Sequence, residues 1–185
     1  MNQNRVVKFS LYLVYLIPIL ILTGPFLPGL ALSIVSLISF YLIFYKKKFY
    51  LINNKFSILI ILWLLYLVLR SLFSDNIYLS LESSLFYGRF YFYSLFIYYA
   101  VCEIDKFNTR YILLLLITLS ITLIDAYTQL IFGQNILGFN YSSNRLSGFF
   151  GEEKILGSFI SKLLFCITGI FFIINLNKNN SIYFY

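Results

Sequence analysis

Histidine is absent from the 185-residue sequence, and cysteine occurs only twice, as Cys102 and Cys166. The chain therefore offers no His or Cys cluster for zinc, no Ser-His or Cys-His nucleophile pair and no haem ligand of the usual kinds. Charged residues are also scarce, at 11% of the chain. Any chemistry that this chain supplies must use Arg, Lys, Asp, Glu or Tyr, and we expect neither a metal ion nor a cofactor.

Hydrophobic residues dominate the composition instead. They make up 61% of the sequence, and the mean hydropathy is +0.86, which is more than a soluble domain can hide inside one core. The net charge is +7, but the cations lie in short segments between apolar runs and not along one stripe. This distribution indicates membrane topology and no nucleic-acid partner. We predict an all-α, polytopic integral membrane helix bundle in contact with membrane lipids.

Apolar runs recur along the chain at the length that a bilayer requires, about 20 residues for a hydrocarbon core about 30 Å thick. Six runs are complete, and a seventh begins in the last five residues, SIYFY. Because five residues cannot cross a bilayer, we expect residues 1–185 to be a single transmembrane domain, the N-terminal part of a longer protein. The six predicted spans cover residues 7–23, 30–45, 56–73, 85–102, 111–132 and 155–176.

The distribution of cations orients these spans. With a cytoplasmic N-terminus, nine flanking cations lie on the inner face and three, Arg70, Arg145 and Lys154, lie on the outer face. We therefore predict that the N-terminus is cytoplasmic. Residues 125–162, which contain five of the nine glycines, then open on the outer side of the membrane, and we expect the functional centre there.

Three ionisable residues fall within predicted spans: Arg89, Asp125 and Lys162. Each costs about 2.5 to 3.5 kcal/mol at the centre of a membrane helix, so each requires a reason. Asp125 could pair with Lys162 or Arg89 and hold helices together, while its spacing from Gln129 places both on one helix face. One carboxylate cannot neutralise Arg89, Lys162 and the outer Arg145 together, so we expect an anionic ligand near the glycine-rich loop.

The order of residues in this segment also resembles a known family. Asp125-Ala-Tyr-Thr-Gln129 ends one predicted span, and Arg145-Leu-Ser-Gly148-Phe-Phe-Gly151-Glu-Glu leads into Ile155-Leu-Gly157-Ser-Phe and the cation Lys162. An Arg, a small residue, Gly, an aromatic residue, an acidic group and then Gly-Ser-aromatic in this order resemble the O-antigen ligase and O-antigen polymerase superfamily of bacterial inner-membrane glycosyltransferases. The resemblance covers residues 71–176.

The resemblance implies a protein of the bacterial inner membrane that binds a polyprenyl pyrophosphate-linked glycan on the periplasmic side. A ligase transfers the glycan to lipid A core sugar, and a polymerase transfers it to a second lipid-linked glycan. The family's base is a histidine of a later outer loop, so we expect the catalytic base outside this chain and no activity from the chain alone. The residues that match the family's pyrophosphate site are Arg145 and, after it, Arg89 and Lys162, supported by Asp125, Gln129, Gly148 and Gly151.

Two other interpretations remain open from the sequence. A transporter or flippase of anionic lipid-linked sugars requires the same outer cations but no base. A non-catalytic partner subunit or a gene remnant would use the charges only to hold helices together. A path that opens to both membrane faces would favour the transporter.

Overall fold

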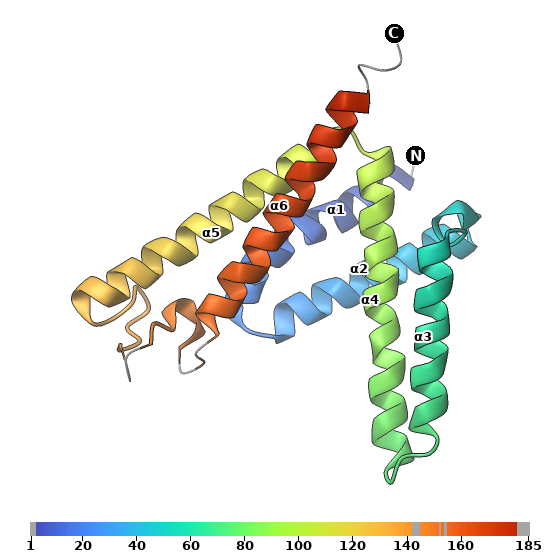
Figure 1. Cartoon of the computed structure of the whole chain (residues 1–185), viewed down its shortest axis with the longest axis horizontal. Helices are drawn as coiled ribbons and strands as arrows, with labels where there is room; N and C mark the ends of the chain where they lie inside the picture. The colour runs from blue at the N-terminus through green and yellow to red at the C-terminus, as the bar shows by residue number, and fades with distance from the viewer. Residues whose placement is uncertain (1–2, 142–144, 152, 154, 181–185) are drawn as a thin grey trace. The chain divides into compact units, whose positions relative to one another are not determined.

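The computed structural model describes residues 3–141, 145–151, 153 and 155–180. Over these residues the regular structure is six α-helices and three short 3-10 helices, with isolated bridges but no strand, which confirms the all-α prediction. Figure 1 labels the α-helices. They are α1 (Gln3–Leu20), α2 (Phe26–Phe44), α3 (Lys55–Ser71), α4 (Ile77–Glu103), α5 (Phe107–Phe132) and α6 (Leu156–Asn180), and the 3-10 helices are η1 (Ile21–Thr23), η2 (Phe49–Leu51) and η3 (Gly148–Phe150).

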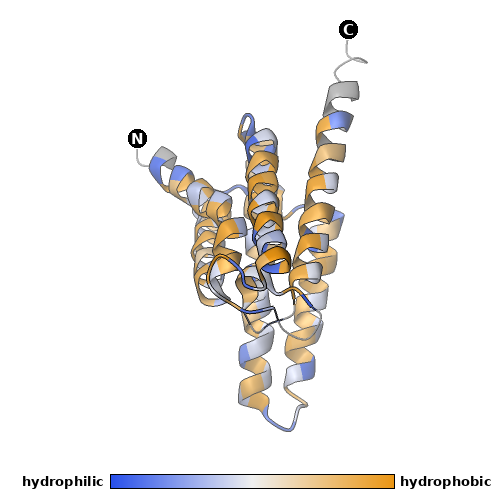
Figure 2. Ribbon diagram, turned by 90° about the vertical axis from the view of Figure 1, so that its left-hand side faces the viewer, coloured by the Kyte–Doolittle hydropathy of each residue, from blue (hydrophilic) through white to orange (hydrophobic). Residues whose placement is uncertain are grey.

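Each α-helix covers most of one of the six predicted apolar runs. Figure 2 shows that hydrophobic residues make up much of the helical ribbon. In the described part of the chain, three helical stretches are long and apolar enough to cross a membrane: Arg5–Thr23, Phe26–Phe44 and Phe107–Phe132. The apolar stretch of α6, Leu156–Phe172, is shorter. The molecule therefore has the character of a membrane protein, with three described stretches long and apolar enough to span a bilayer, while six complete spans stay a prediction.

The chain divides into two compact units, of which the first comprises residues 1–17 and 28–105. Its main feature is an antiparallel hairpin of α3 and α4, joined by a tight turn at residues 72–76 (Figure 1). Both helices begin at an asparagine cap: the Asn54 side chain accepts from Ser57 N at 2.7 Å, and Asn76 precedes Ile77 in the same way. Helix α2 contacts α4 through an edge-to-face ring pair, Phe40 and Phe92, with centroids 5.3 Å apart.

The end of the hairpin opposite the turn carries an ion pair. Glu103, the last residue of α4, accepts hydrogen bonds from Lys48 and Tyr50, which belong to the connection between α2 and α3. The Lys48 ammonium also lies 4.3 Å from the centroid of the Tyr99 ring. The connection between α2 and α3 and the C-terminal end of α4 therefore meet at one end of this unit.

The second unit comprises residues 18–27 and 106–185. Helices α5 and α6 pack against each other around a small core of Leu115, Phe159 and Leu163, to which Leu22 and Phe150 add partly buried side chains. Because Leu22 belongs to η1 and Phe150 to η3, the connection between α1 and α2 lies at the same end of this unit as the loop between α5 and α6. Our prediction of a single domain is not tested by this division and stays a prediction.

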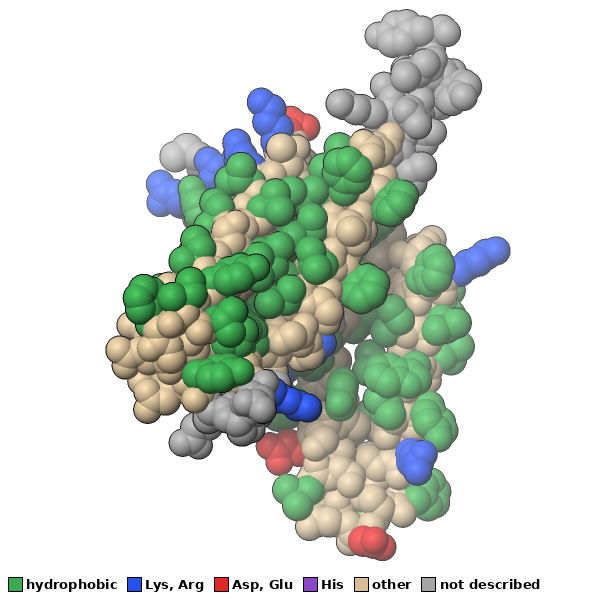
Figure 3. Space-filling view, turned by 60° about the vertical axis from the view of Figure 1, so that its left-hand side comes forward, with side chains coloured by type: hydrophobic (Ala, Val, Ile, Leu, Met, Phe, Trp, Pro, Cys, Tyr) green, Lys and Arg blue, Asp and Glu red, His purple; other side chains and the backbone are tan. Residues whose placement is uncertain are grey.

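Apolar side chains cover much of the molecular surface. Tyr78, Phe73, Phe56 and Phe165 are at least 78% exposed, and Figure 3 shows a face on which hydrophobic side chains outnumber charged ones. Patches of this kind mark surfaces that contact a membrane or a partner. The cysteines Cys102 and Cys166 are free and exposed. The residues 181–185, from which we predict a seventh span, lie outside the described residues.

Candidate functional site

The predicted functional centre is the loop between α5 and α6 in the second unit. Helix α5 ends because Gly133 adopts the left-handed conformation (φ 75°, ψ −4°) and its N–H donates to Gln129 O at 3.1 Å. Such a residue is usually glycine, since a Cβ is disfavoured there. The chain then folds back on itself, with a bridge between Gln134 and Asn140 and a hydrogen bond from Tyr141 N to Gly133 O at 2.7 Å.

Asn135 shapes the tight turn inside this fold-back. Its side-chain oxygen accepts from Leu137 N at 3.1 Å and from Phe139 N at 2.7 Å, while its own N–H donates to Phe139 O at 3.0 Å. Asparagine favours turns because its side chain can bond to nearby backbone groups in this way. Its amide nitrogen remains free to donate to Gly148 O at 2.8 Å and to Asp125 Oδ2 at 3.3 Å. Asn135 therefore joins α5 to both ends of the loop.

Asp125 is fully buried one turn before Gln129 in α5. Its two carboxylate oxygens accept from two consecutive loop residues, Oδ1 from Ile136 N at 3.0 Å and Oδ2 from Asn135 Nδ2. Within the described residues Asp125 has no ion pair, so the predicted alternative of a pair with Lys162 is wrong here. The loop folds onto the carboxylate and satisfies it with neutral donors, which costs less than leaving it unpaired in an apolar environment.

Gln129, which is also fully buried, fastens the other half of the loop. Its Oε1 accepts from Ser147 N at 3.0 Å and Gly148 N at 2.9 Å, and its Nε2 donates to Ser147 Oγ at 3.1 Å and Phe139 O at 3.3 Å. One amide side chain thus uses both its oxygen and its nitrogen on loop backbone and loop hydroxyl groups. The segment around residue 147 is therefore held by α5 in addition to its own turn hydrogen bond from Phe150 N to Ser147 O.

At two positions of the predicted site, Gly148 and Gly151, neighbouring atoms leave little room for a Cβ. At Gly148, with φ +55°, an added Cβ would lie 3.2 Å from Asp125 Oδ2 and 3.4 Å from a methyl group of Leu156. At Gly151, with φ +61°, it would lie 3.3 Å from the Phe139 ring. Both positions combine a left-handed backbone with a tight contact, so both favour glycine for structural reasons.

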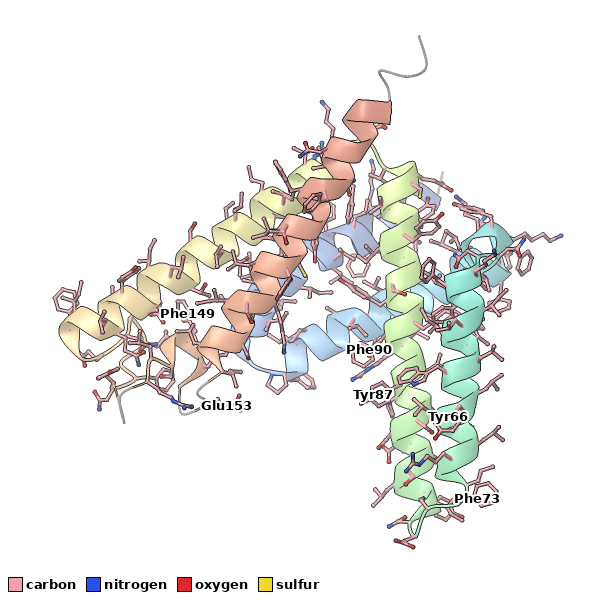
Figure 4. All side chains as sticks on the ribbon, viewed as in Figure 1. Tyr66, Phe73, Tyr87, Phe90, Phe149 and Glu153 are labelled. Carbon is pink, nitrogen blue, oxygen red and sulfur yellow. The ribbon has the colours of Figure 1, made fainter. Side chains whose placement is uncertain are left out.

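The predicted cations differ from these buried residues. Arg145 and Lys162 are exposed, and neither side chain has a hydrogen-bond or ion-pair partner among the residues that the structure describes. Arg145 stands two residues before Ser147, where Gln129 fixes the backbone. The loop also carries Phe149 and the exposed Glu153, which Figure 4 labels. Glu152 and Lys154 lie outside the described residues.

Arg89, the third predicted cation, belongs to α4 in the first unit. It is half-buried, with its guanidinium 5.4 Å and 5.1 Å from the ring centroids of Phe86 and Phe90 and one long contact of 3.5 Å from NH1 to Ser33 Oγ. Its Nε is buried and without a partner in the described structure. The membership of Arg89 in the predicted site therefore stays a prediction.

The sequence prediction missed two members of the loop network, Asn135 and Ser147. Both are buried, at 5% exposure. A signal for each was present: Asn135 precedes a turn that ends in Gly138, and Ser147 stands directly before Gly148 in the Arg-Leu-Ser-Gly motif.

Comparison of the chain with known protein families, characterised proteins and solved structures found no match.

Proposed function

We propose that this chain forms part of a multi-pass glycosyltransferase of the bacterial inner membrane that takes glycan from a polyprenyl pyrophosphate carrier. The proposal includes six spans, a cytoplasmic N-terminus and a loop between α5 and α6 that faces the periplasm. Its acceptor is lipid A core sugar or a second lipid-linked glycan. The order of residues from Asp125 to Lys162 supports it, because it resembles O-antigen ligases and polymerases.

One structural observation supports an anion-binding role most directly. Gln129 and Asp125 hold the loop with six hydrogen bonds from buried positions, and Arg145 remains exposed and unpaired within the described residues of this fixed loop. An arginine held in this way offers a fork of N–H donors to phosphate oxygens with little ordering cost on binding. Lys162 would add a point charge, without the bidentate geometry of arginine.

In the proposed reaction the acceptor hydroxyl attacks the anomeric carbon of the carrier-linked sugar. The new glycosidic bond forms as the bond between that carbon and the pyrophosphate oxygen breaks, and the bonding electrons leave with the polyprenyl pyrophosphate. Arg145, with Lys162 and Arg89, would stabilise the charge that develops on this leaving group. The hydroxyl proton requires a base, which the resemblance assigns to a histidine of a later outer loop; since the chain has no histidine, we propose that this base lies outside it.

Binding of a pyrophosphate lipid tests the proposal on the chain as it is. We expect the purified protein in detergent to bind geranylgeranyl pyrophosphate, and Arg145→Gln to weaken binding about tenfold, the loss that corresponds to one charge-assisted hydrogen-bonded contact. Arg110→Gln removes the same charge from an exposed position of the same unit and is the matched control. Equal affinity of the Arg145 and Arg110 variants would overturn the assignment of Arg145.

Activity is tested separately in cells that assemble the surface glycan. Arg145→Ala should abolish glycan transfer while the protein remains in the membrane at normal abundance. Wild-type transfer by this variant would refute the proposed site. Movement of lipid-linked glycan across the membrane without formation of a glycosidic bond would refute the transferase and favour a transporter.

A further inference from the structure

A second candidate site lies in the first unit, on the hairpin of α3 and α4. A cavity of about 650 Å³ opens there near the turn, within the range of small-ligand sites. Its walls combine one cation, Arg70, with five serines and the aromatic side chains of Phe73 and Tyr87. Figure 4 shows Phe73 at the turn and Tyr87 farther along α4. Neither Asp75 nor Glu82, the acidic residues of this hairpin end, lines the cavity.

Four of the five serine hydroxyl groups of this cavity donate their proton to the backbone, so they can serve a ligand only as acceptors. Ser71 donates its proton to Val68 O at 2.7 Å, Ser83 to Leu79 O at 2.9 Å, and Ser84 to Leu81 O at 3.0 Å. Ser74 donates to Ser71 O at 2.9 Å. A hydroxyl has one proton but two lone pairs, so these oxygens can still accept from a ligand although their donors are used. A ligand with hydroxyl groups of its own fits this lining.

Arg70 supplies the donors that the serines lack. It is exposed at the end of α3, and its only hydrogen bond among the described residues is a long one, from NH1 to Tyr66 OH at 3.4 Å. Most of its N–H groups are therefore available. An arginine beside hydroxyl acceptors matches a phosphate that carries hydroxyl-bearing substituents.

A second cavity continues along the same hairpin and is lined by apolar and aromatic residues. It measures about 480 Å³, and its lining includes Trp63, Phe90 and Leu64. Tyr87 lines both cavities, and its ring meets that of Trp63 edge to face at 6.2 Å. Figure 4 shows Tyr87 and Phe90 in succession on α4. The polar cavity and the apolar cavity thus share a wall, which is the arrangement that an amphiphile with a polar head and a hydrocarbon chain would occupy.

We propose that the hairpin of α3 and α4 binds an anionic lipid whose phosphodiester headgroup carries free hydroxyl groups. The phosphate would lie at Arg70, the headgroup hydroxyls would donate to the serine oxygens, and the hydrocarbon chain would follow Tyr87 to Trp63. Glycerophospholipids such as phosphatidylglycerol and lipid-linked sugar phosphates share this chemistry. The proposal concerns the first unit alone and does not depend on the glycosyltransferase function.

The chain contains its own probe, because Trp63 is its single tryptophan and lines the apolar cavity. Lipids with brominated acyl chains quench a tryptophan that they touch. The protein is reconstituted in phosphatidylcholine vesicles that contain an equal mole fraction of brominated phosphatidylglycerol or brominated phosphatidylcholine. We expect stronger quenching by phosphatidylglycerol, and Arg70→Gln should reduce this preference about fivefold, as for loss of one cation at an anionic lipid surface.

Arg5→Gln removes an arginine from another exposed position of the first unit and should keep the preference. Circular dichroism on both variants establishes that they remain helical. Equal quenching by the two lipids in the wild type would mean unselective contact with the bilayer and would overturn the proposal. A preference that survives Arg70→Gln would overturn the assignment to this cavity.

The role of the hydroxyl groups is tested with phosphatidylmethanol, which has the same charge but no headgroup hydroxyl. We expect brominated phosphatidylmethanol to quench Trp63 less than brominated phosphatidylglycerol does, and Ser83→Ala, at an exposed position, to narrow this difference. Equal quenching by the two anionic lipids would overturn the hydroxyl specificity. Unbrominated phosphatidylglycerol and a polyprenyl phosphoglucose are then added as competitors. The stronger competitor identifies the source of the headgroup, and recovery of fluorescence by neither contradicts the site.

Discussion

The loop between α5 and α6 and the hairpin of α3 and α4 use polar side chains in opposite ways. In the loop, Asp125 and Gln129 are fully buried and bond to the protein itself. In the hairpin, Arg70 is exposed and the serines face an open cavity. The first arrangement fixes a backbone, and the second leaves hydrogen-bonding capacity for a ligand.

This difference separates the residues that hold a site from those that could contact a ligand. Gln129 has used its donors and its acceptor on the loop, so a ligand could bind to it only by displacing those bonds. Arg145 is exposed and unpaired within the described structure, and Arg70 is exposed with one long hydrogen bond. Both arginines therefore retain most of their N–H donors for a ligand. A buried polar residue near a predicted centre is therefore first a candidate for positioning and only then for binding.

Substitution of Gln129 tests the first half of this comparison and has the largest expected effect. Gln129→Ala leaves the N–H groups of Ser147 and Gly148 buried without their acceptor. We expect destabilisation of about 3 kcal/mol, since each buried unpaired group costs about 1 to 3 kcal/mol and water can enter part of the space. Thermal unfolding in detergent measures it, and limited proteolysis should show new cleavage within residues 133–155.

The matched control is Gln134→Ala, because Gln134 is exposed and contributes to the loop through its backbone bridge to Asn140. We expect the control to lie within about 0.5 kcal/mol of the wild type. If Gln129→Ala and Gln134→Ala were equally stable, the buried network would not be what holds the loop.

Two glycine substitutions in the second unit give the next largest effects, and we expect their effects on the free energy of unfolding to have opposite signs. Gly148→Ala places a methyl group on a left-handed backbone and 3.2 Å from Asp125 Oδ2, so we expect a loss of about 2 kcal/mol. Gly157→Ala lies in α6, with nothing within 4 Å of the added carbon, and should stabilise the helix by up to about 1 kcal/mol. Denaturant or thermal unfolding of both variants measures the two shifts. A loss of the same size in both would contradict the close approach at Gly148.

The helical fold was predictable because each apolar run is interrupted by residues that end helices. The lysines 46–48 and Gly24 mark boundaries that the structure retains, whereas α2 begins at Phe26, four residues before the predicted span, and so includes Pro28 and Gly29. The start of α4 differs in one respect: Asn76 caps a helix that runs without a break from Ile77, whereas we expected a short interfacial helix after the caps at residues 74–76 and then a span that begins at residue 85. The serines in its first turns lower the hydropathy of that stretch, and their modest helix propensity does not prevent a helix there. Hydropathy therefore locates helices more reliably than it counts membrane spans.

The candidate site was only half predictable for a related reason. The spacing of Asp125 and Gln129 places them on one face of α5, and the glycines predict a loop, as the structure confirms. Their partners, however, are backbone N–H groups of Ile136, Ser147 and Gly148, which every sequence possesses and no side-chain pattern reveals. Arg70 was assigned to membrane topology, because its cavity exists only once α3 and α4 lie side by side.

The ion pair of the first unit is the exposed counterpart of the loop network and should contribute least. Burial alone would raise the pKa of Glu103, but hydrogen bonds from Lys48 and Tyr50 and the charge of Lys48 outweigh it, so this pKa lies below its ordinary value. Burial and the hydrogen bond to Glu103 also raise the pKa of Tyr50. Because the pKa of Glu103 is lower in the folded than in the unfolded state, Glu103 contributes to the free energy of unfolding. This contribution is complete above the unfolded pKa and is lost as the pH falls through the folded pKa.

Lys48→Gln should therefore cost less than about 1 kcal/mol at neutral pH, because the pair is partly exposed to solvent. The cost should shrink as the pH is lowered below the ordinary pKa of a glutamate and as salt is added. Lys47→Gln, which removes a neighbouring exposed lysine without a partner in the described structure, is the control. Unfolding of both variants in detergent from neutral to acid pH measures the difference. A cost as large as that of Gln129→Ala would mean that this end of the hairpin is held as firmly as the buried loop, and the contrast between the two regions would fail.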